Sequence, residues 1–191
     1  MSKFFGNEVF HIAYVTKDLD KEVDRWLASG IGPFYYAKGL KLKSKYRGER
    51  HDLTISVAFA YTGSLMLELV VQDDDVPSSF KEYLDRVPEG GLHHIAYIVD
   101  DLDRAVKDAA SRGTQFVPVQ EFLGADGKPV EIYMEPKGVK NTVFTQIVLP
   151  SAWDDAFAEL KGIAAKWDGK TPKRNMYDLL SPELRGALDV A

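Results

Sequence analysis

The tetrapeptide His-Ile-Ala-Tyr occurs twice in this chain, once beginning at His11 and again, 83 residues later, at His94. Each copy opens a longer segment that ends in glycine, and segments 11–30 and 94–113 are identical at nine of their twenty positions. An internal repeat of this length indicates one supersecondary unit that is used twice. The repeat also puts two histidines at equivalent positions, and histidine is the commonest metal ligand among side chains.

Both copies begin with an apolar run rich in aromatic and β-branched residues, over 9–15 and over 92–99, and each run predicts a strand. An Asp-Leu-Asp sequence then predicts a helix start in each copy, because an aspartate side chain can accept the free amide hydrogens of the first turn. Apolar residues follow at helical spacing. Gly30 and Gly113 stand where these helices end, in the left-handed conformation that glycine adopts readily.

Three further strand-like runs follow each helix, at 33–38, 53–61 and 64–71 in the first copy and at 115–122, 130–135 and 142–149 in the second. The order strand, helix, three strands therefore occurs twice. This pattern predicts an α+β fold of two βαβββ modules, the first over residues 8–72 and the second over residues 92–149.

The remaining segments are expected to be largely helical. Residues 73–91 form a polar linker with a predicted helix over 79–87 that Ser78 or Ser79 caps. A tail over 150–191 has helical spacing in its first part and a second helix start at Pro182. We expect this tail to cap the domain or to cover the mouth of a site.

The composition limits the classes of partner. The net charge of −5 argues against nucleic acid, because phosphate binding needs a basic surface. The one basic stretch, 38–50, is interpreted as a solvated hairpin loop, with an anion-docking surface as the alternative. The chain has no cysteine, residues 1–6 lack the apolar run of a signal peptide, and no stretch approaches the roughly 20 apolar residues of a membrane span. We therefore expect a soluble cytoplasmic protein with no nucleic-acid or membrane partner.

The repeat also suggests a site. If His11 faces inward on the first strand of one module, His94 faces inward on the matching strand of the other. Glu68 lies between two leucines in the apolar run 64–71, and a carboxylate buried there is costly without a metal, a basic group or water as its partner. The matching position of the second module holds Gln146. Two imidazoles, a carboxylate and an amide oxygen could together bind a divalent first-row metal.

Two other histidines are expected to lie outside this site. His93 should face away from His94, because neighbours on a strand point to opposite sides of the sheet. His51 begins a strand after the basic stretch, and a surface position is expected for it.

These residues carry a resemblance to the vicinal oxygen chelate superfamily, which includes glyoxalase I, methylmalonyl-CoA epimerase, extradiol dioxygenases and bleomycin-resistance proteins. The similarity covers about three quarters of the chain and is closest to the glyoxalase-like subgroup that includes methylmalonyl-CoA epimerase. It rests on the His11-Ile-Ala-Tyr opening and on segments 30–34, 67–69, 93–96 and 132–135. The resemblance implies an open barrel around one metal site, with ligands from the first and last strand of each module, which are His11, Glu68, His94 and Gln146 here. Zn, Mn, Co, Ni or Fe could occupy such a site.

One position departs from the family pattern, since metalloenzymes of this group usually carry Glu where this chain has Gln146. Glutamine can offer an oxygen ligand but cannot act as a base. The catalytic carboxylate is therefore sought elsewhere, with Glu68 and Glu135 as the residues chosen and with Glu121 and Glu131 as alternatives on nearby strands.

The leading functional hypothesis is a metal-dependent isomerase, epimerase or lyase that stabilises an enolate of a small carbonyl compound. The aromatic residues around the expected site favour an apolar or aromatic substrate. An extradiol-type non-haem iron dioxygenase is the first alternative, and a non-catalytic ligand-binding protein of the resistance type is the second. The resemblance also implies a homodimer.

Overall fold

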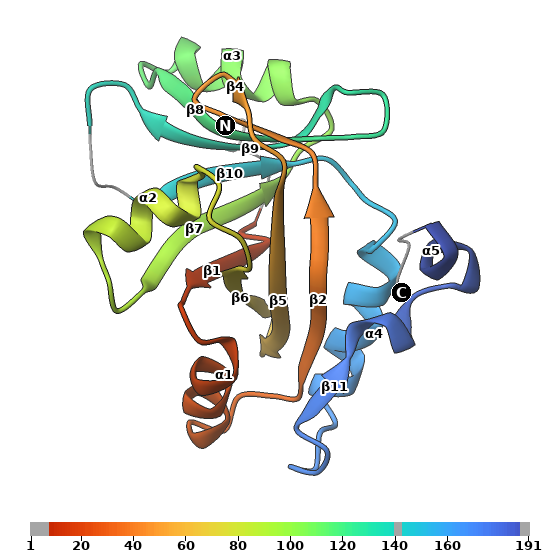
Figure 1. The fold of residues 1–191 in the computed structure, drawn as a ribbon. Helices are drawn as coiled ribbons and strands as arrows, with labels where there is room; N and C mark the ends of the chain where they lie inside the picture. Colours follow the sequence, from red (N-terminus) through yellow and green to blue (C-terminus); the bar gives the residue numbers. More distant parts are fainter. Residues whose placement is uncertain (1–7, 140–142, 188–191) are drawn as a thin grey trace.

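The computed structural model describes residues 8–139 and 143–187, and Figure 1 shows the course of the chain. The predictions made for residues 1–6, for Thr142 and for the last four residues of the tail lie outside this description. None of the helices within it is long and apolar enough to cross a membrane.

The first module, module 1, contains β1 (His11–Val15), α1 (Leu19–Ala28), β2 (Phe34–Leu42), β3 (Ser44–Tyr46), β4 (Glu49–Arg50), β5 (Leu53–Thr62) and β6 (Leu65–Gln72). Helix α2 (Ser79–Arg86) links it to module 2, which contains β7 (Gly91–Ile98), α3 (Leu102–Ser111), β8 (Phe116–Leu123), β9 (Pro129–Pro136) and β10 (Phe144–Val148). The tail contains α4 (Asp154–Ala164), β11 (Lys173–Asn175), the 3₁₀ helix η1 (Met176–Leu179) and α5 (Pro182–Ala187). The predicted α+β fold of two βαβββ modules is confirmed.

The described strands form one mixed sheet of eleven strands in the order β11-β2-β5-β6-β1-β7-β10-β9-β8-β3-β4. The central pair, β1 and β7, is antiparallel, and each of these strands pairs in parallel with the last strand of its own module. Read outward from the centre, the order β1-β6-β5-β2 of module 1 is therefore repeated in module 2 as β7-β10-β9-β8. This arrangement brings the first and last strands of both modules together in the middle of the sheet.

Both predicted helix starts are formed by aspartate. Asp18 accepts a hydrogen bond from the Lys21 amide, and Asp101 accepts one from the Arg104 amide. Helix α1 packs an apolar stripe against the outer face of module 1, and α3 does the same in module 2. Both helices cover the outer face of the sheet. Because alternate strand residues point to opposite faces, the remaining residues of each strand line the inner face, where the site can form.

The prediction of a solvated loop over 38–50 is wrong in one respect. The segment does make a hairpin, but β3 pairs with β8 and so extends the sheet of module 2 with residues of module 1. At the tip of the hairpin, Arg47 forms ion pairs with Glu82 of α2 at 2.8 Å and with Glu135 of β9 at 3.3 Å. The basic stretch therefore ties the two modules together.

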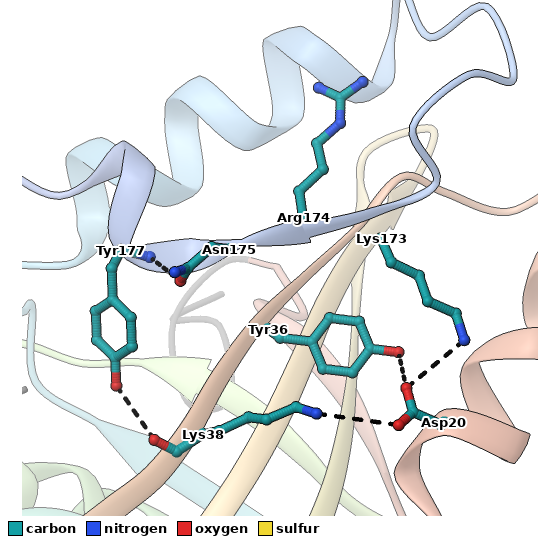
Figure 2. Close-up of a pocket in the computed structure, with 7 residues that line it drawn as sticks. All are labelled: Asp20, Tyr36, Lys38, Lys173, Arg174, Asn175 and Tyr177. Atoms are coloured by element: carbon teal, nitrogen blue, oxygen red, sulfur yellow. Dashed lines mark hydrogen bonds and ion pairs between the residues drawn. The ribbon is translucent and has the colours of Figure 1, made fainter. Parts of the chain in front are cut away.

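The tail covers module 1. Phe157 of α4 packs edge-on against Phe59 of β5, with ring centroids 5.1 Å apart, and β11 adds a parallel strand beside β2. An open surface pocket lies where β11, β2 and α1 meet; Figure 2 shows its lining residues Asp20, Tyr36, Lys38, Lys173, Arg174, Asn175 and Tyr177. Within it Tyr36 donates a hydrogen bond to Asp20 at 2.8 Å, and Lys173 reaches Asp20 at 3.6 Å. These polar contacts fasten the tail to α1.

Candidate metal centre

The central strand pair sets the positions of the two repeated histidines. In the antiparallel register of β1 and β7, Ala13 lies opposite His94, and His11 lies opposite Ala96. In the parallel register of β1 and β6, Ala13 lies beside Glu68. Ala13 therefore lies between Glu68 on one neighbouring strand and His94 on the other. The side chains of Glu68 and His94 both reach His11.

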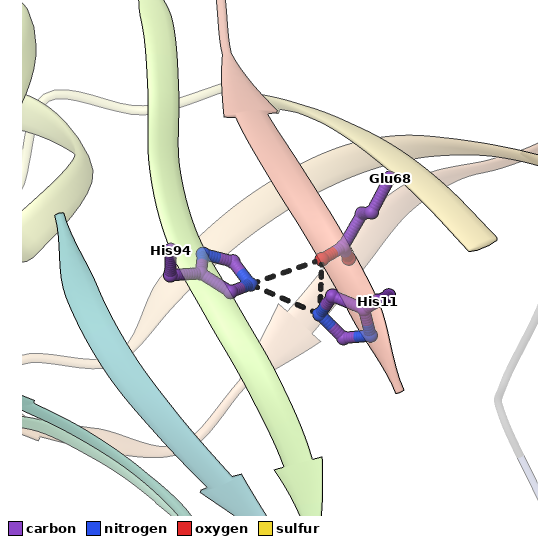
Figure 3. Close-up of side chains that lie close together, drawn as sticks. All are labelled: His11, Glu68 and His94. Atoms are coloured by element: carbon purple, nitrogen blue, oxygen red, sulfur yellow. Dashed lines mark hydrogen bonds and ion pairs between the residues drawn. The ribbon is translucent and has the colours of Figure 1, made fainter. Parts of the chain in front are cut away.

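The three predicted side chains converge on one point of the inner face (Figure 3). The Nε2 atoms of His11 and His94 are 3.1 Å apart. The Oε2 atom of Glu68 lies 3.2 Å from Nε2 of His11 and 3.3 Å from Nε2 of His94. All three side chains are almost completely buried. The structure thus brings together His11, Glu68 and His94, while their role as metal ligands stays a prediction.

The charges in this cluster are strongly coupled. Burial alone would raise the pKa of Glu68, but interaction with the neighbouring imidazoles of His11 and His94 lowers it below its ordinary value. Burial lowers the pKa of His94 to about 4, although the Glu68 carboxylate opposes this shift. The cluster therefore favours an ionised Glu68 beside a neutral His94, which is the protonation state that metal ligands need.

The donor set fits a divalent cation. Donor atoms placed about 2.0–2.2 Å from one metal ion, at angles between octahedral and tetrahedral, lie roughly 2.8–3.6 Å from one another. The three separations of 3.1, 3.2 and 3.3 Å fall within this range. In addition, Oε2 of Glu68 accepts no hydrogen bond of good geometry from the described residues, although it is buried. A buried anionic oxygen of this kind is normally paired or bound to a metal.

Gln146 lies on the same inner face, on β10, which is the strand next to β7. Its strand neighbour in β7 is Ala96, and Ala96 in turn lies opposite His11. The side chain is buried, and its Oε1 atom has no hydrogen-bond partner within the described part of the chain. An unpaired buried oxygen beside the three converging donors fits the predicted fourth ligand.

A carboxylate that the sequence offered only as an alternative stands next to Gln146. Glu131 of β9 is partly buried, and burial together with the negative charge of Glu68 raises its pKa to about 7. The hydroxyl of Tyr133 and the side-chain amide of Gln146 act in the opposite sense, since both stabilise the charged form of Glu131. Glu131 is thus a carboxyl group beside the cluster that can hold or release a proton near neutral pH.

The other glutamates have different surroundings. Glu135, chosen from the sequence as a catalytic residue, lies in the ion pair with Arg47. Glu121 pairs with Ile132 in the β8–β9 register, and Ile132 belongs to the outer apolar cluster under α3, so that Glu121 shares the outer face. Neither residue belongs to the group of donors that could hold a metal.

The prediction that His93 faces away from His94 is wrong. Nδ1 of His93 lies 2.8 Å from Nδ1 of His94, and His93 is only 1% exposed. The cause is a break in the β1–β7 register, where Ala13 pairs with His94 but Tyr14 pairs with Leu92. His93 is therefore the extra residue of a β-bulge, which re-aims its side chain toward the inner face. Burial and the neighbouring His94 hold the pKa of His93 well below its usual value.

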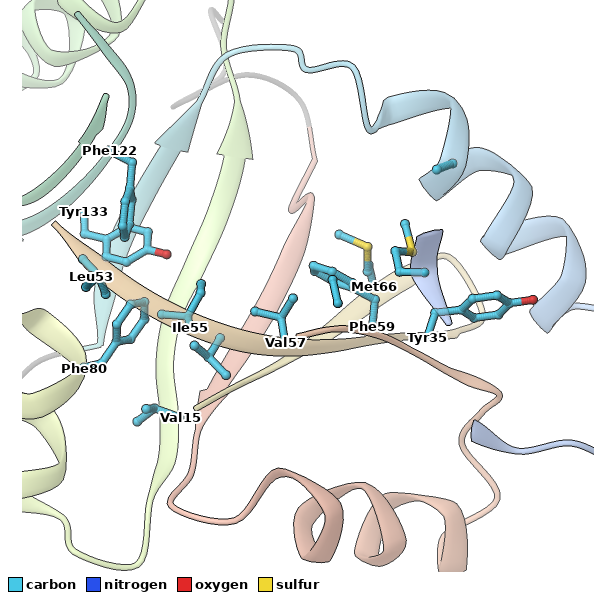
Figure 4. Packing of buried hydrophobic residues seen from close by; sticks show 14 of the residues in the cluster. Val15, Tyr35, Leu53, Ile55, Val57, Phe59, Met66, Phe80, Phe122 and Tyr133 are labelled. Atoms are coloured by element: carbon cyan, nitrogen blue, oxygen red, sulfur yellow. The ribbon is translucent and has the colours of Figure 1, made fainter. Parts of the chain in front are cut away.

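Apolar side chains continue the inner face on both sides of the cluster. Figure 4 shows Leu53, Ile55, Val57 and Phe59 in line along β5, with Phe80, Phe122 and Tyr133 at one end and Met66 and Tyr35 toward the other. Near the tail, Phe10 packs against His11 and against Phe157, with ring centroids 5.0 and 5.9 Å apart. Near module 2, Tyr133 stacks on His94 at 4.6 Å. The ligand candidates are therefore held by aromatic neighbours.

Comparison with known proteins identifies the family of this chain. Residues 10–131 match the sequence profile of the glyoxalase/bleomycin resistance protein/dioxygenase superfamily. The chain is 26% identical to the mitochondrial methylmalonyl-CoA epimerase of Dictyostelium discoideum over 133 residues, which are 70% of this chain and 73% of that protein. It is 32% identical to the human mitochondrial methylmalonyl-CoA epimerase over 83 residues, or 44% of this chain and 46% of that protein.

Solved structures show the same fold. The methylmalonyl-CoA epimerase of Mycobacterium tuberculosis superposes with a TM-score of 0.52 at 18% identity, over 79% of this chain and 93% of that one. A hypothetical protein from Bacillus halodurans superposes with a TM-score of 0.50 at 18% identity, over 75% and 94% of the two chains. With the profile match and the shared fold, this chain belongs to the glyoxalase/bleomycin resistance protein/dioxygenase superfamily.

Proposed function

We propose that this chain is an epimerase or isomerase that depends on a divalent metal and acts on a small acyl thioester of the methylmalonyl-CoA type. The convergence of His11, Glu68 and His94 within 3.3 Å of one another carries the proposal. The epimerase relatives support the choice of reaction and substrate. This substrate is more polar than the apolar or aromatic carbonyl compound expected from the sequence.

A divalent cation held by His11, Glu68 and His94, with Gln146 as a fourth oxygen donor, would polarise a substrate carbonyl and stabilise the charge that develops as the neighbouring C–H proton leaves. We assign removal of that proton to Glu131. Its pKa of about 7 allows the carboxylate to accept a proton and to give it back at neutral pH. Glu135, by contrast, is neutralised by Arg47.

Epimerisation also requires a proton to reach the opposite face of the planar enolate. Glu68 belongs to β6 of module 1, whereas Glu131 belongs to β9 of module 2, so the two carboxylates approach from opposite sides of the central strand pair. Glu68 is therefore the candidate for the second face, if it loosens from the cluster during the reaction. Glu68 is almost completely buried and Glu131 is partly buried, and the lower dielectric of such surroundings strengthens each charge contact.

Hydrogen exchange at the substrate carbon tests the proposal. Metal-loaded protein is incubated in D₂O with one epimer of methylmalonyl-CoA, and deuterium incorporation and inversion are followed by NMR and chiral analysis. We expect both for the wild type and neither after removal of metal by a chelator. Glu131→Gln should lose exchange, and Glu135→Gln, four residues along the same strand, should retain it. Failure of fully metal-loaded wild type to exchange this proton would overturn the epimerase proposal.

One observation favours a second candidate. Two imidazoles and one carboxylate on one side of a site are the ligand set of non-haem iron oxygenases, and His11, Glu68 and His94 supply that set. Iron as the metal that copurifies, with oxygen uptake on a catechol, would favour this extradiol-type reaction over epimerisation. Epimerisation of the thioester by the protein loaded with zinc or cobalt, without oxygen uptake on a catechol, would exclude it.

A further inference from the structure

His93 is the buried histidine of the site that the proposed reaction does not use. The β-bulge in β7 turns it toward the inner face, where its Nδ1 meets Nδ1 of His94 at 2.8 Å. The separation is that of a hydrogen bond, and one of the two nitrogen atoms must therefore carry the proton. The other ring nitrogen of His94, Nε2, is the atom that faces His11 and Glu68.

The direction of this hydrogen bond follows from the chemistry of a metal ligand. A neutral imidazole that offers the lone pair of Nε2 to a metal carries its proton on Nδ1. The Nδ1–H group of His94 then donates to Nδ1 of His93, which must accept. We propose that His93 is a positioning residue that holds His94 in the tautomer and orientation needed for metal binding, an inference that rests on the proposed metal-dependent function.

The surroundings of His93 suit this role. In the accepting tautomer its own proton lies on Nε2, which is buried and forms no hydrogen bond of good geometry with the described residues, although the main chain of Ser79 at the start of α2 raises the pKa of the ring. The rings of Phe80 and Phe144 lie 4.9 Å from the His93 ring, and those of Tyr83 and Tyr133 lie 5.5 and 5.6 Å away. This aromatic cage leaves the imidazole little freedom to turn, so the acceptor atom stays aimed at His94.

Module 1 has no such device. The residue before His11 is Phe10, whose ring packs on the His11 imidazole but cannot accept a hydrogen bond. Nδ1 of His11 is buried and has no partner among the described residues. The two repeated histidines are therefore held differently, one by packing and the other by a hydrogen bond, and loss of the acceptor should affect only the second.

Two substitutions separate the acceptor from the packing. His93→Phe keeps a flat ring in the aromatic cage but has no acceptor, whereas His93→Asn has a smaller side chain whose amide oxygen stands close to the position of Nδ1. Zn²⁺ affinity is measured by competition with a chromophoric chelator, and folding is checked by thermal denaturation. We expect affinity to fall by about 10–100-fold in His93→Phe, the usual effect of losing an outer-shell partner. We expect His93→Asn to remain within a few fold of wild type.

A spectroscopic readout accompanies the affinities. In the zinc-loaded wild type and in His93→Asn, ¹⁵N NMR should show His94 protonated at Nδ1 with a slowly exchanging proton, and in His93→Phe this proton should exchange rapidly. If His93→Phe does not fold, His93→Gln replaces it, because its amide oxygen lies one carbon further along and should miss the acceptor position. Equal zinc affinity in the wild type and in the variant without the acceptor would overturn the role of His93 alone. Absence of binding of zinc and of every other divalent first-row metal tried by the wild type would overturn the proposed function itself.

Discussion

Modules 1 and 2 share one fold and one repeated histidine, but they surround that histidine with different chemistry. Strand register makes the comparison possible, because Phe59 lies opposite Glu68 in module 1 and Tyr133 lies opposite Gln146 in module 2. One strand further from the centre, Val57 of module 1 occupies the position that Glu131 occupies in module 2. Phe10 and His93 precede the two repeated histidines.

The difference lies in where each module carries its charge. Module 1 carries a carboxylate at the ligand position, Glu68, and surrounds it with apolar side chains. Module 2 carries an amide at the ligand position, Gln146, and a carboxylate one strand outward at Glu131. Each module therefore contributes one acidic group near the site. We infer that Glu68 of module 1 supplies the charge that holds the metal and, when it loosens, the proton carrier for the second face, whereas Glu131 of module 2 supplies the base that removes the first proton.

Removal of the module 1 carboxylate should have the largest effect. Glu68→Gln keeps the size and shape of the side chain but deletes the negative charge of the cluster. We expect metal affinity to fall by more than the roughly 100-fold upper range of outer-shell changes, since a direct charged ligand is lost. Isothermal titration with Zn²⁺ or Co²⁺ measures this. A variant that binds metal as tightly as wild type would show that module 1 does not supply the charge.

Removal of the module 2 carboxylate should affect chemistry instead. Glu131→Gln is expected to lower kcat by at least about 10²-fold, the usual contribution of a general base, while metal affinity stays within a few fold. Steady-state kinetics on metal-loaded protein tests this, with Glu135→Gln as the matched control. Loss of metal and of activity in the same proportion would contradict the division of roles between the modules.

Glu131→Gln should also change how the free energy of unfolding depends on pH. The pKa of Glu131 is raised from 4.5 to about 7 in the folded state, so ionisation opposes folding. The destabilisation is absent below pH 4.5, grows as the pH rises toward 7, and is complete above it. Metal-free Glu131→Gln should therefore be more stable than wild type at pH 8, by about 1–3 kcal/mol, and equal to it at pH 4. Urea denaturation at both values checks this, and a variant no more stable at pH 8 would show that Glu131 is not held in its neutral form.

The smallest effect is expected at the amide of module 2. Gln146→Ala removes a neutral oxygen donor, which adds less to the binding of a divalent cation than a carboxylate does. We expect metal affinity to fall by about 10-fold, less than in Glu68→Gln, in the same titration. An effect of Gln146→Ala that exceeded the effect of Glu68→Gln would reverse the comparison between the modules.

Much of this arrangement could be predicted from the sequence because it depends on local periodicity. The repeat gave the order of strands and helices, and strand alternation placed His11, Glu68 and His94 on one face. Local periodicity could not decide which of Glu121, Glu131 and Glu135 is the catalytic base. Glu131 and Glu135 share a face of β9, and only the pairing with β10 decides that Glu131 stands near Gln146.

The direction of His93 and the pairing of the hairpin over 38–50 depend on contacts between distant parts of the chain, which local sequence patterns do not predict. His93 was expected on the outer face because the strand was assumed to be regular, and a single bulge reversed its direction. The run of basic residues over 38–50 predicts a solvated hairpin loop, whereas the hairpin pairs with β8 and joins residues 76 positions apart. Long-range register is the information that a single sequence lacks.

The central claim is that one metal ion binds between the two modules, and metal stoichiometry tests it most directly. Plasma mass spectrometry on untagged wild type, His11→Ala and His94→Ala, each loaded with metal, dialysed and shown to be folded, measures the metal bound per chain. We predict close to one equivalent in the wild type and almost none in either variant, since each module contributes one imidazole. No bound metal in the wild type under any loading condition, or full retention in both variants, would contradict the account.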